Sequence, residues 1–281
     1  MDIKEMESCV SPKNIVHNIS DKVMLNKTKY GKIKTLMLGI AAGAMISFGA
    51  QGSMIATTGT DVISFGLAKL LAGLVFSTGL MMIVLTGAEL FTGNVLICFS
   101  LLEKKTTLQK LLRNWLLVYV GNIIGALIVS GLIYISSSYH GPSEALGVLG
   151  LKVAYAKLQL TPIQAFTSGI LCNWLVCLAV WMAMAAKDVA GKILAIVFPI
   201  TTFVMAGYEH CVANMFFLSN GYFIKHSTAV VEASGLTVTQ LANINITSAI
   251  FDSFIPVTLG NIAGAFLFVV CIFWVAYIRK D

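Results

Sequence analysis

The sequence predicts an all-α membrane protein whose six transmembrane helices form two inverted halves, with the second and the fifth helix broken. The first observation is composition: 57% of the 281 residues are hydrophobic and 11% are charged, whereas about a quarter of a soluble domain is charged. The second is that the charges gather at the ends of long apolar runs. The third is a short polar motif that occurs twice, each time inside such a run. Lipid, rather than water, must therefore surround most of the chain.

Six apolar runs are long enough to cross a bilayer, which takes about 20 residues. The second and the fifth are too long for one straight helix, and each contains a polar, glycine-bearing interruption. The runs cover residues 35–57, 66–101, 112–136, 162–185, 191–219 and 248–277. The chain thus divides into a polar tail, residues 1–34, and a transmembrane domain of six spans, residues 35–281.

The charge distribution predicts the orientation, because the cytoplasmic loops of membrane proteins carry an excess of lysine and arginine. With six spans, both termini lie on one side of the membrane. That side carries fifteen basic residues, and the other side carries four: Lys69, Lys152, Lys157 and Lys225. We therefore expect both termini in the cytoplasm and the protein in the inner (plasma) membrane.

The tail is polar and rich in lysine, with apolar residues at helical spacing at Ile15, Ile19, Val23 and Met24. This pattern predicts an amphipathic helix that lies on the membrane surface. The net charge of +6 does not indicate a nucleic-acid partner, because the basic residues flank the spans and are explained by topology.

The two polar motifs reveal an internal repeat. Residues 87–94 read GAELFTGN and residues 207–214 read GYEHCVAN, so each has glycine, then glutamate two further on, then asparagine five beyond that. The third span of each half adds a second match, GNIIGA at 121–126 and GNIAGA at 260–265. Because each half has three spans, the halves must run in opposite directions. Broken helices at matching places of an inverted repeat are the best pointer to a permeation site.

The breaks favour an anion. Backbone that a break frees must be buried in protein or line a wet cavity. The half-helix that restarts after each break points its N-terminus, with unpaired N–H groups and partial positive charge, at the middle of the membrane. Gly87, Gly93 and Gly207 are expected to supply the turns.

Two glutamates, Glu89 and Glu209, occur at membrane depth, where an unpaired carboxylate is costly. A bare carboxylate would repel an anion. We therefore expect them to be structural, accepting hydrogen bonds from freed backbone amides or from Asn94 and Asn214. A proton relay is the alternative.

His210 is the candidate for direct contact with the anion. A buried neutral imidazole can donate a hydrogen bond to the anion. A protonated ring can instead give its proton to the anion, which then crosses as the neutral acid, or it can stay charged while the anion passes. Thr92, in the first break, offers a hydroxyl. Lys157 could draw anions to the outer mouth, although a solvated loop lysine is equally compatible with the sequence.

Three segments carry a family resemblance: GAELFTGN at 87–94, CNWLVCLAVWMA at 172–183 and GYEHCVANM at 207–215. They closely resemble the signature segments of the formate/nitrite transporter family, and the resemblance extends from about residue 13 to 280. It implies an aquaporin-like fold, a homopentamer with one pore in each protomer, cytoplasmic termini, no enzymatic activity and no cofactor.

The resemblance also implies roles for single residues. Leu90 would join the central constriction beside Thr92 and opposite Phe203, and Leu80 would narrow the cytoplasmic side. His210 would face Thr92. Lys157 would be a lysine of the outer vestibule, and Phe76 would lie near the inner mouth. Asn173 and Asn261 would be pore-lining or structural asparagines.

Within the family, ATTGT at 56–60, FSTGL at 76–80 and IPVTLGN at 255–261 look like segments of bacterial formate channels. We therefore expect formate as the transported anion. Nitrite and hydrosulfide stay open, because they are also small, monovalent and conjugate to weak acids. Movement could be channel-like or linked to a proton.

Two rival classes fit poorly. A membrane-embedded enzyme would need a nucleophile elbow or a metal-binding cluster, and the sequence offers neither, so no metal is expected. A neutral-solute pore of the aquaporin kind relies on paired NPA-type turns and a filter arginine, which this chain lacks. The six cysteines have no zinc-ligand or redox spacing.

Overall fold

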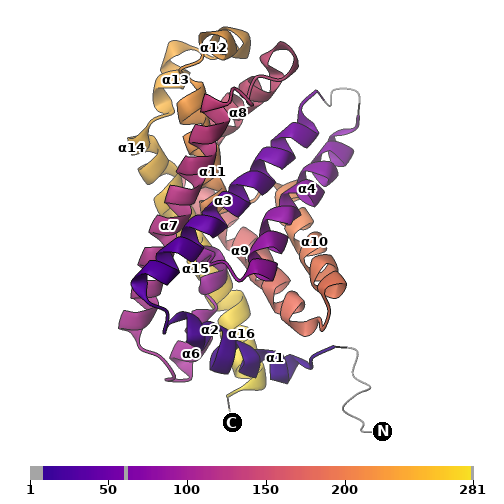
Figure 1. The fold of residues 1–281 in the computed structure, drawn as a ribbon, viewed down its shortest axis with the longest axis vertical. Helices are drawn as coiled ribbons and strands as arrows, with labels where there is room; N and C mark the ends of the chain where they lie inside the picture. The colour runs from indigo at the N-terminus through magenta and orange to yellow at the C-terminus, as the bar shows by residue number, and fades with distance from the viewer. Residues whose placement is uncertain (1–8, 60–62, 280–281) are drawn as a thin grey trace.

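The computed structural model describes residues 9–59 and 63–279, and within them every regular element is a helix (Figure 1). Residues 1–8 of the expected tail lie outside the described residues. So do Thr60 of the ATTGT segment and two charges used for the orientation, Lys4 and Lys280.

Six helical spans are long and apolar enough to cross a membrane, as the sequence predicts. The last of them contains two π-helical turns, η4 (Ala249–Phe254) and η5 (Phe266–Cys271), between short α-helices. The spans are α3 (Lys32–Thr57), α4 (Phe65–Thr86), α7 (Leu108–Ile135), α9 (Pro162–Ala185), α10 (Val189–Ala206) and Ile246–Tyr277, which comprises α14 (Ile246–Ser248), η4, α15 (Ile255–Ala265), η5 and α16 (Ile272–Tyr277).

The second and the fifth predicted spans are both broken. After α4 the chain restarts as α5 (Phe91–Asn94) and α6 (Ile97–Leu102), and after α10 it restarts as α11 (Cys211–Ile224). The breaks therefore divide each of these spans into one membrane-length helix and one shorter apolar helix, in the middle of the molecule (Figure 1).

The two halves pack in the same way. In the first half α3 lies against α7, and in the second half α9 lies against α15. The contacts are backbone to backbone: a Cβ at Gly125 would collide with the Ile40 carbonyl oxygen, and one at Gly264 with the Ile170 carbonyl oxygen. Small residues allow such close helix approach inside a membrane, so glycine is required at both crossings.

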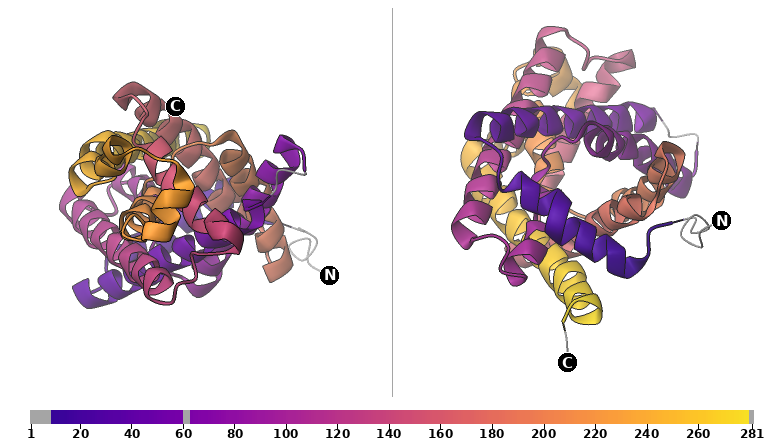
Figure 2. Two further views of the ribbon diagram at one scale, coloured as in Figure 1. Left: turned by 90° about the horizontal axis from the view of Figure 1, so that it is seen from above. Right: turned by 60° about the horizontal axis from the view of Figure 1, so that its bottom comes forward.

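The N-terminal segment consists of α1 (Pro12–Asn18), η2 (Ile19–Val23) and α2 (Met24–Lys27). It crosses the end of the bundle, contacting α6, α9 and α16 (Figure 2, right). Ile15, Ile19 and Met24 are buried in these contacts, while Val23 is exposed. The expectation that this apolar face rests on the membrane is thus corrected, because the protein itself covers it.

The opposite end of the molecule carries the short elements (Figure 1). They are η3 (Pro142–Glu144), α8 (Ala145–Lys157), α12 (Thr228–Ser234) and α13 (Val238–Asn243). Following the expected orientation, we call this the outer end and the end with α1 and α16 the inner end.

Candidate functional site

Each break begins with a glycine in the left-handed region. Gly87 (φ 74°) ends α4 and Gly207 (φ 72°) ends α10, a conformation that favours glycine. Gly93 does not supply a turn, contrary to expectation: it lies inside α5, beyond the break, and it lines the inner cavity. The turn needs one left-handed residue, and Gly87 already provides it.

An asparagine caps the start of each half-helix. The Phe91 N–H donates to Asn122 Oδ1 (3.0 Å), and the Cys211 N–H donates to Asn261 Oδ1 (2.9 Å). These asparagines belong to the repeated GNxxGA segments. Each satisfies a backbone donor that has no partner within its own helix.

The same asparagines tie the breaks to the long helices. Asn122 Nδ2 donates to the carbonyl oxygens of Gly39 (2.8 Å) and Glu89 (3.0 Å). Asn261 Nδ2 donates to those of Gly169 (2.8 Å) and Glu209 (2.9 Å). Asn261 is therefore structural. Sequence reasoning did not single out Asn122, although its place in the repeated motif pointed to it.

At the inner break, Glu89 is fully buried and has several partners. Its Oε2 accepts a hydrogen bond from Asn94 Nδ2 (2.6 Å), and its Oε1 lies 3.0 Å from Lys27 Nζ. Lys27 also donates to Asn94 Oδ1 (2.9 Å). The carboxylate is thus neutralised by a lysine of the N-terminal segment, a residue that sequence reasoning did not identify.

At the outer break, Glu209 has the matching set of partners. Lys157 Nζ donates to its Oε1 (2.9 Å) and Oε2 (3.0 Å), and Asn214 Nδ2 donates to Oε2 (2.6 Å). Lys157 is the last residue of α8, and its side chain is 15% exposed. Lys157 is therefore not a solvated loop lysine, and its charge is already paired.

Between the two breaks, Thr92 meets His210. Thr92 Oγ1 lies 2.9 Å from His210 Nε2, and both residues are buried. His210 Nδ1 accepts the Ala213 N–H (3.0 Å), so it carries no hydrogen. The neutral ring therefore has its hydrogen on Nε2 and donates it to Thr92, which leaves the threonine hydroxyl hydrogen available for another acceptor.

Asn173 supports this pair from α9. Its Nδ2 donates to the Thr92 carbonyl oxygen (3.2 Å) and to the Asn261 carbonyl oxygen (2.8 Å). It is fully buried and joins α5 of the first half to α15 of the second. Asn173 thus positions the first break relative to the second.

Two cavities approach the site from opposite ends. The outer cavity, about 320 Å³, is lined by Phe76, Phe203 and His210, among others. The inner cavity, about 530 Å³, is lined by Leu80 and Leu90 together with residues of the N-terminal segment. The buried Thr92–His210 pair lies between them.

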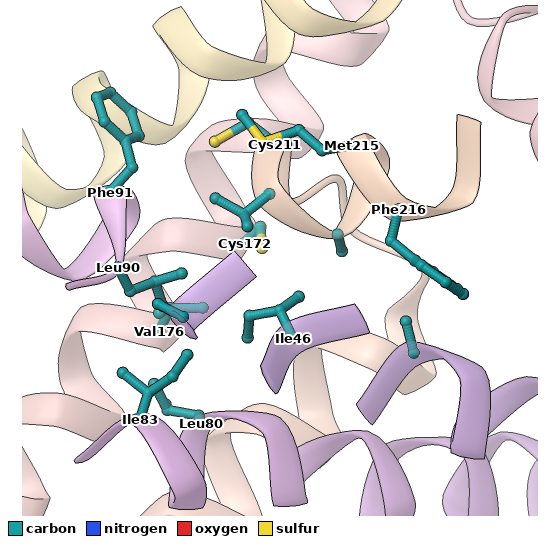
Figure 3. Close-up of a cluster of buried hydrophobic side chains, with 14 of the residues drawn as sticks. Ile46, Leu80, Ile83, Leu90, Phe91, Cys172, Val176, Cys211, Met215 and Phe216 are labelled. Carbon is teal, nitrogen blue, oxygen red and sulfur yellow. The ribbon is translucent and has the colours of Figure 1, made fainter. Parts of the chain in front are cut away.

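The constrictions differ from those expected. Phe203 does not oppose Leu90: it packs edge-to-face on Phe76, with ring centroids 5.5 Å apart, in the outer cavity. Leu90 and Leu80 line the inner cavity. Figure 3 shows Leu90 beside Val176, and Leu80 beside Ile83 of the same helix. Phe76 and Phe203 thus line the outer cavity, whereas Leu80 and Leu90 line the inner one.

Phe76 is therefore an outer residue and not one near the inner mouth. The physical reason is the direction of α4, which begins at the outer end at Phe65 and runs to the break at Thr86. Phe76 precedes Leu80 by about one helical turn, or roughly 6 Å, so it must lie on the outer side of it.

Comparison with known proteins agrees with this architecture. Residues 13–275 match the model of the formate/nitrite transporter family. The chain is 37% identical to the formate channel FocA of Escherichia coli strain K12, over 94% of this chain and 93% of that protein. It is also 37% identical to a probable formate transporter of Methanothermobacter thermautotrophicus, over 88% and 90% of the two chains.

Two solved structures resemble the fold. A pentameric formate channel with formate bound superposes with a TM-score of 0.80 and is 36% identical, covering 88% of this chain and 98% of that one. An ion channel of the same family superposes with a TM-score of 0.76 at 24% identity, covering 94% and 98%. These proteins are channels and transporters, which confirms that the chain is not an enzyme. The chain belongs to the formate/nitrite transporter family.

Proposed function

We propose that the protein conducts formate across the inner (plasma) membrane, through a path that leads from the inner cavity past Thr92 and His210 to the outer cavity. The observation that carries this proposal is the buried Thr92–His210 pair, held between two half-helix starts. The relatives named for formate and the formate-bound pentameric structure support the substrate and a homopentamer with one path in each protomer.

The electrostatics of the site suit a small monovalent anion. The two carboxylates nearest the path, Glu89 and Glu209, are each paired with a lysine, so neither repels an anion with a full charge. The N-termini of α5 and α11 add partial positive charge at the same depth. The centre of the path is thus neutral to slightly positive.

Two apolar constrictions flank the polar pair. Side chains at Phe76–Phe203 and at Leu80–Leu90 cannot replace water around a hydrated ion, so they exclude ions that stay hydrated. Formate is small, and its carboxylate can accept the hydrogen of the Thr92 hydroxyl as water is lost. The pair of constrictions therefore favours small anions that can replace lost water by accepting a hydrogen bond from Thr92, over ions that stay hydrated and over large carboxylates.

We infer that His210 acts as a neutral hydrogen-bond donor. Protonation at Nδ1 would place an N–H against the Ala213 N–H, which now donates to that atom. The arrangement thus opposes a charged ring, and a neutral ring has no readily released proton. A proton that crosses with formate would then come from water in a cavity rather than from His210.

We propose the orientation that the distribution of lysine and arginine predicts, with α1 and α16 on the cytoplasmic side. The lysine-rich N-terminal segment then closes over the inner cavity, and Lys157 lies at the outer cavity.

Reconstituted vesicles test the proposal. Purified protein in liposomes that contain a pH dye would receive formate, nitrite or hydrosulfide at equal concentration, with uptake and membrane current recorded together. We expect the fastest uptake for formate, and its loss in Thr92→Val but not in Thr92→Ser, which keeps the hydroxyl. His210→Ala should also lose it.

The outcomes separate the alternatives. Faster uptake of nitrite or hydrosulfide would overturn formate as the substrate while leaving the path intact. An internal pH change without current would indicate that a proton moves with the anion, and current without a pH change would indicate the anion alone. Equal uptake in wild type and Thr92→Val would contradict the role of the polar pair.

A further inference from the structure

The outer cavity carries an excess of positive charge in its lining. Among its described lining residues are two lysines, Lys69 and Lys157, and no aspartate or glutamate. The cavity leads to Phe76, Phe203 and His210. An anion that approaches from outside must pass through this space, so its potential determines how often an anion reaches the constriction.

Lys157 contributes little to that potential. Its ammonium group is held between both oxygens of Glu209 at 2.9 and 3.0 Å. The pair has no net charge, and its field falls off faster with distance than that of a single ion. The outer-vestibule lysine that the family resemblance implies is therefore already neutralised.

Lys69 differs because no carboxylate among the described residues pairs with it. It lies one turn into α4, half-buried, with Nζ 5.5 Å from the centre of the Phe65 ring. An aromatic face holds an ammonium group by attraction to the ring quadrupole but adds no negative charge. Within the described part of the chain, Lys69 takes part in no ion pair.

We propose that Lys69 is the residue that attracts anions to the outer mouth and concentrates them before the Phe76–Phe203 constriction. This inference rests on the proposed function, since it names a further residue of the same path. Phe65 orients the ammonium group over the cavity, and Lys157 instead holds Glu209 in place. One unscreened charge at the mouth of a cavity raises the local concentration of a monovalent anion by about threefold at low ionic strength.

The test is formate uptake into liposomes as a function of ionic strength. Lys69→Gln should slow uptake about threefold in 10 mM salt, and the difference should vanish in 500 mM salt, where charges are screened within a few ångström. Lys69→Arg, which keeps the charge, should behave like wild type. Lys152→Gln is the matched control, because Lys152 is an exposed lysine of α8 at the same end and does not line the cavity.

The result that would overturn the inference is equal uptake by wild type and Lys69→Gln in low salt. A slowing that persists unchanged in high salt would also contradict it, because it would indicate a structural defect and not an electrostatic one. Wild type that takes up no formate at any ionic strength would instead contradict the proposed function, so the two failures are distinguishable.

Discussion

The inner and the outer break of the path are built on one plan. Lys27 lies five residues before the start of α3, and Lys157 lies five residues before the start of α9. Each lysine pairs with the glutamate that follows the turn glycine of its half, and an asparagine donates to that glutamate over 2.6 Å in both halves. The repeat thus includes the segment before each first span.

The two breaks differ in how the lysine is delivered and shared. Lys157 comes from α8 and donates hydrogen bonds to both oxygens of Glu209. Lys27 comes from the N-terminal segment, forms an ion pair with one oxygen of Glu89 and donates a hydrogen bond to Asn94. As a result Asn94 Oδ1 has a partner, while Asn214 Oδ1 is buried with no hydrogen-bond partner among the described residues. What both halves retain is the charge balance of the carboxylate, and not the geometry that achieves it.

The largest expected effect comes from removing one lysine. Lys157→Met leaves Glu209 with Asn214 as its remaining side-chain donor, and an unpaired buried charge costs about 4 kcal/mol of stability. Lys27→Met should cost about half as much, roughly 2 kcal/mol, because Glu89 keeps two side-chain donors, Asn94 and Asn114. Thermal unfolding in detergent would measure both.

The double variant Lys157→Met with Glu209→Gln is the control for this prediction. It removes both charges and keeps an oxygen that can accept from Asn214, so it should recover most of the lost stability. Equal losses for Lys27→Met and Lys157→Met would contradict the difference between the halves.

The next effect concerns the caps, where the two halves should agree. Asn122→Ala and Asn261→Ala each leave three buried backbone groups without their side-chain partner: one N–H that donates to the asparagine and two carbonyl oxygens that accept from it. Each should cost about 2 to 3 kcal/mol, and the two losses should match. Asn26→Ala, at an exposed position, should leave stability unchanged. A large difference between the two caps would show that the inverted repeat is not energetically symmetric.

The sequence predicted the spans, both breaks and the repeat, because hydropathy and motif spacing are local properties. It did not predict Lys27, which lies 62 positions before its partner in a polar tail. Comparing the two halves as far as the segments before α3 and α9 would have found it, because a lysine lies five residues before each of these helices. Phe76 was placed on the wrong side because a motif resemblance does not tell how deep in the membrane a residue lies. The direction in which the span runs does determine this.

The smallest effect concerns what holds the N-terminal segment at the inner end. Partial burial disfavours the charged form of Asp21, but hydrogen bonds from Lys105 and Ser20 outweigh it and hold the pKa of its carboxyl below the ordinary value of 3.8. Lys105 correspondingly has a raised pKa, despite the opposing effect of burial. The contact is therefore intact at neutral pH and is lost as pH falls below about 4, through the lowered pKa of Asp21.

Both groups are largely solvated, so the contact contributes less than about 1 kcal/mol. Asp21→Asn should speed hydrogen exchange in residues 12–27 by no more than about fivefold at pH 7. Exchange in wild type, corrected for its intrinsic rate, should stay constant between pH 5 and 8. A transition within that range would show that another group, and not Asp21, controls the segment.

Formate flux through charge-neutral variants tests most directly whether the lysines act by balancing carboxylates. Lys157→Gln alone leaves Glu209 unpaired beside the path, and its repulsion should reduce flux at least about tenfold. Lys157→Gln with Glu209→Gln restores neutrality and should bring flux back to within about threefold of wild type. A double variant as slow as the single one would contradict the charge-balance mechanism and would show that Lys157 acts on the anion itself.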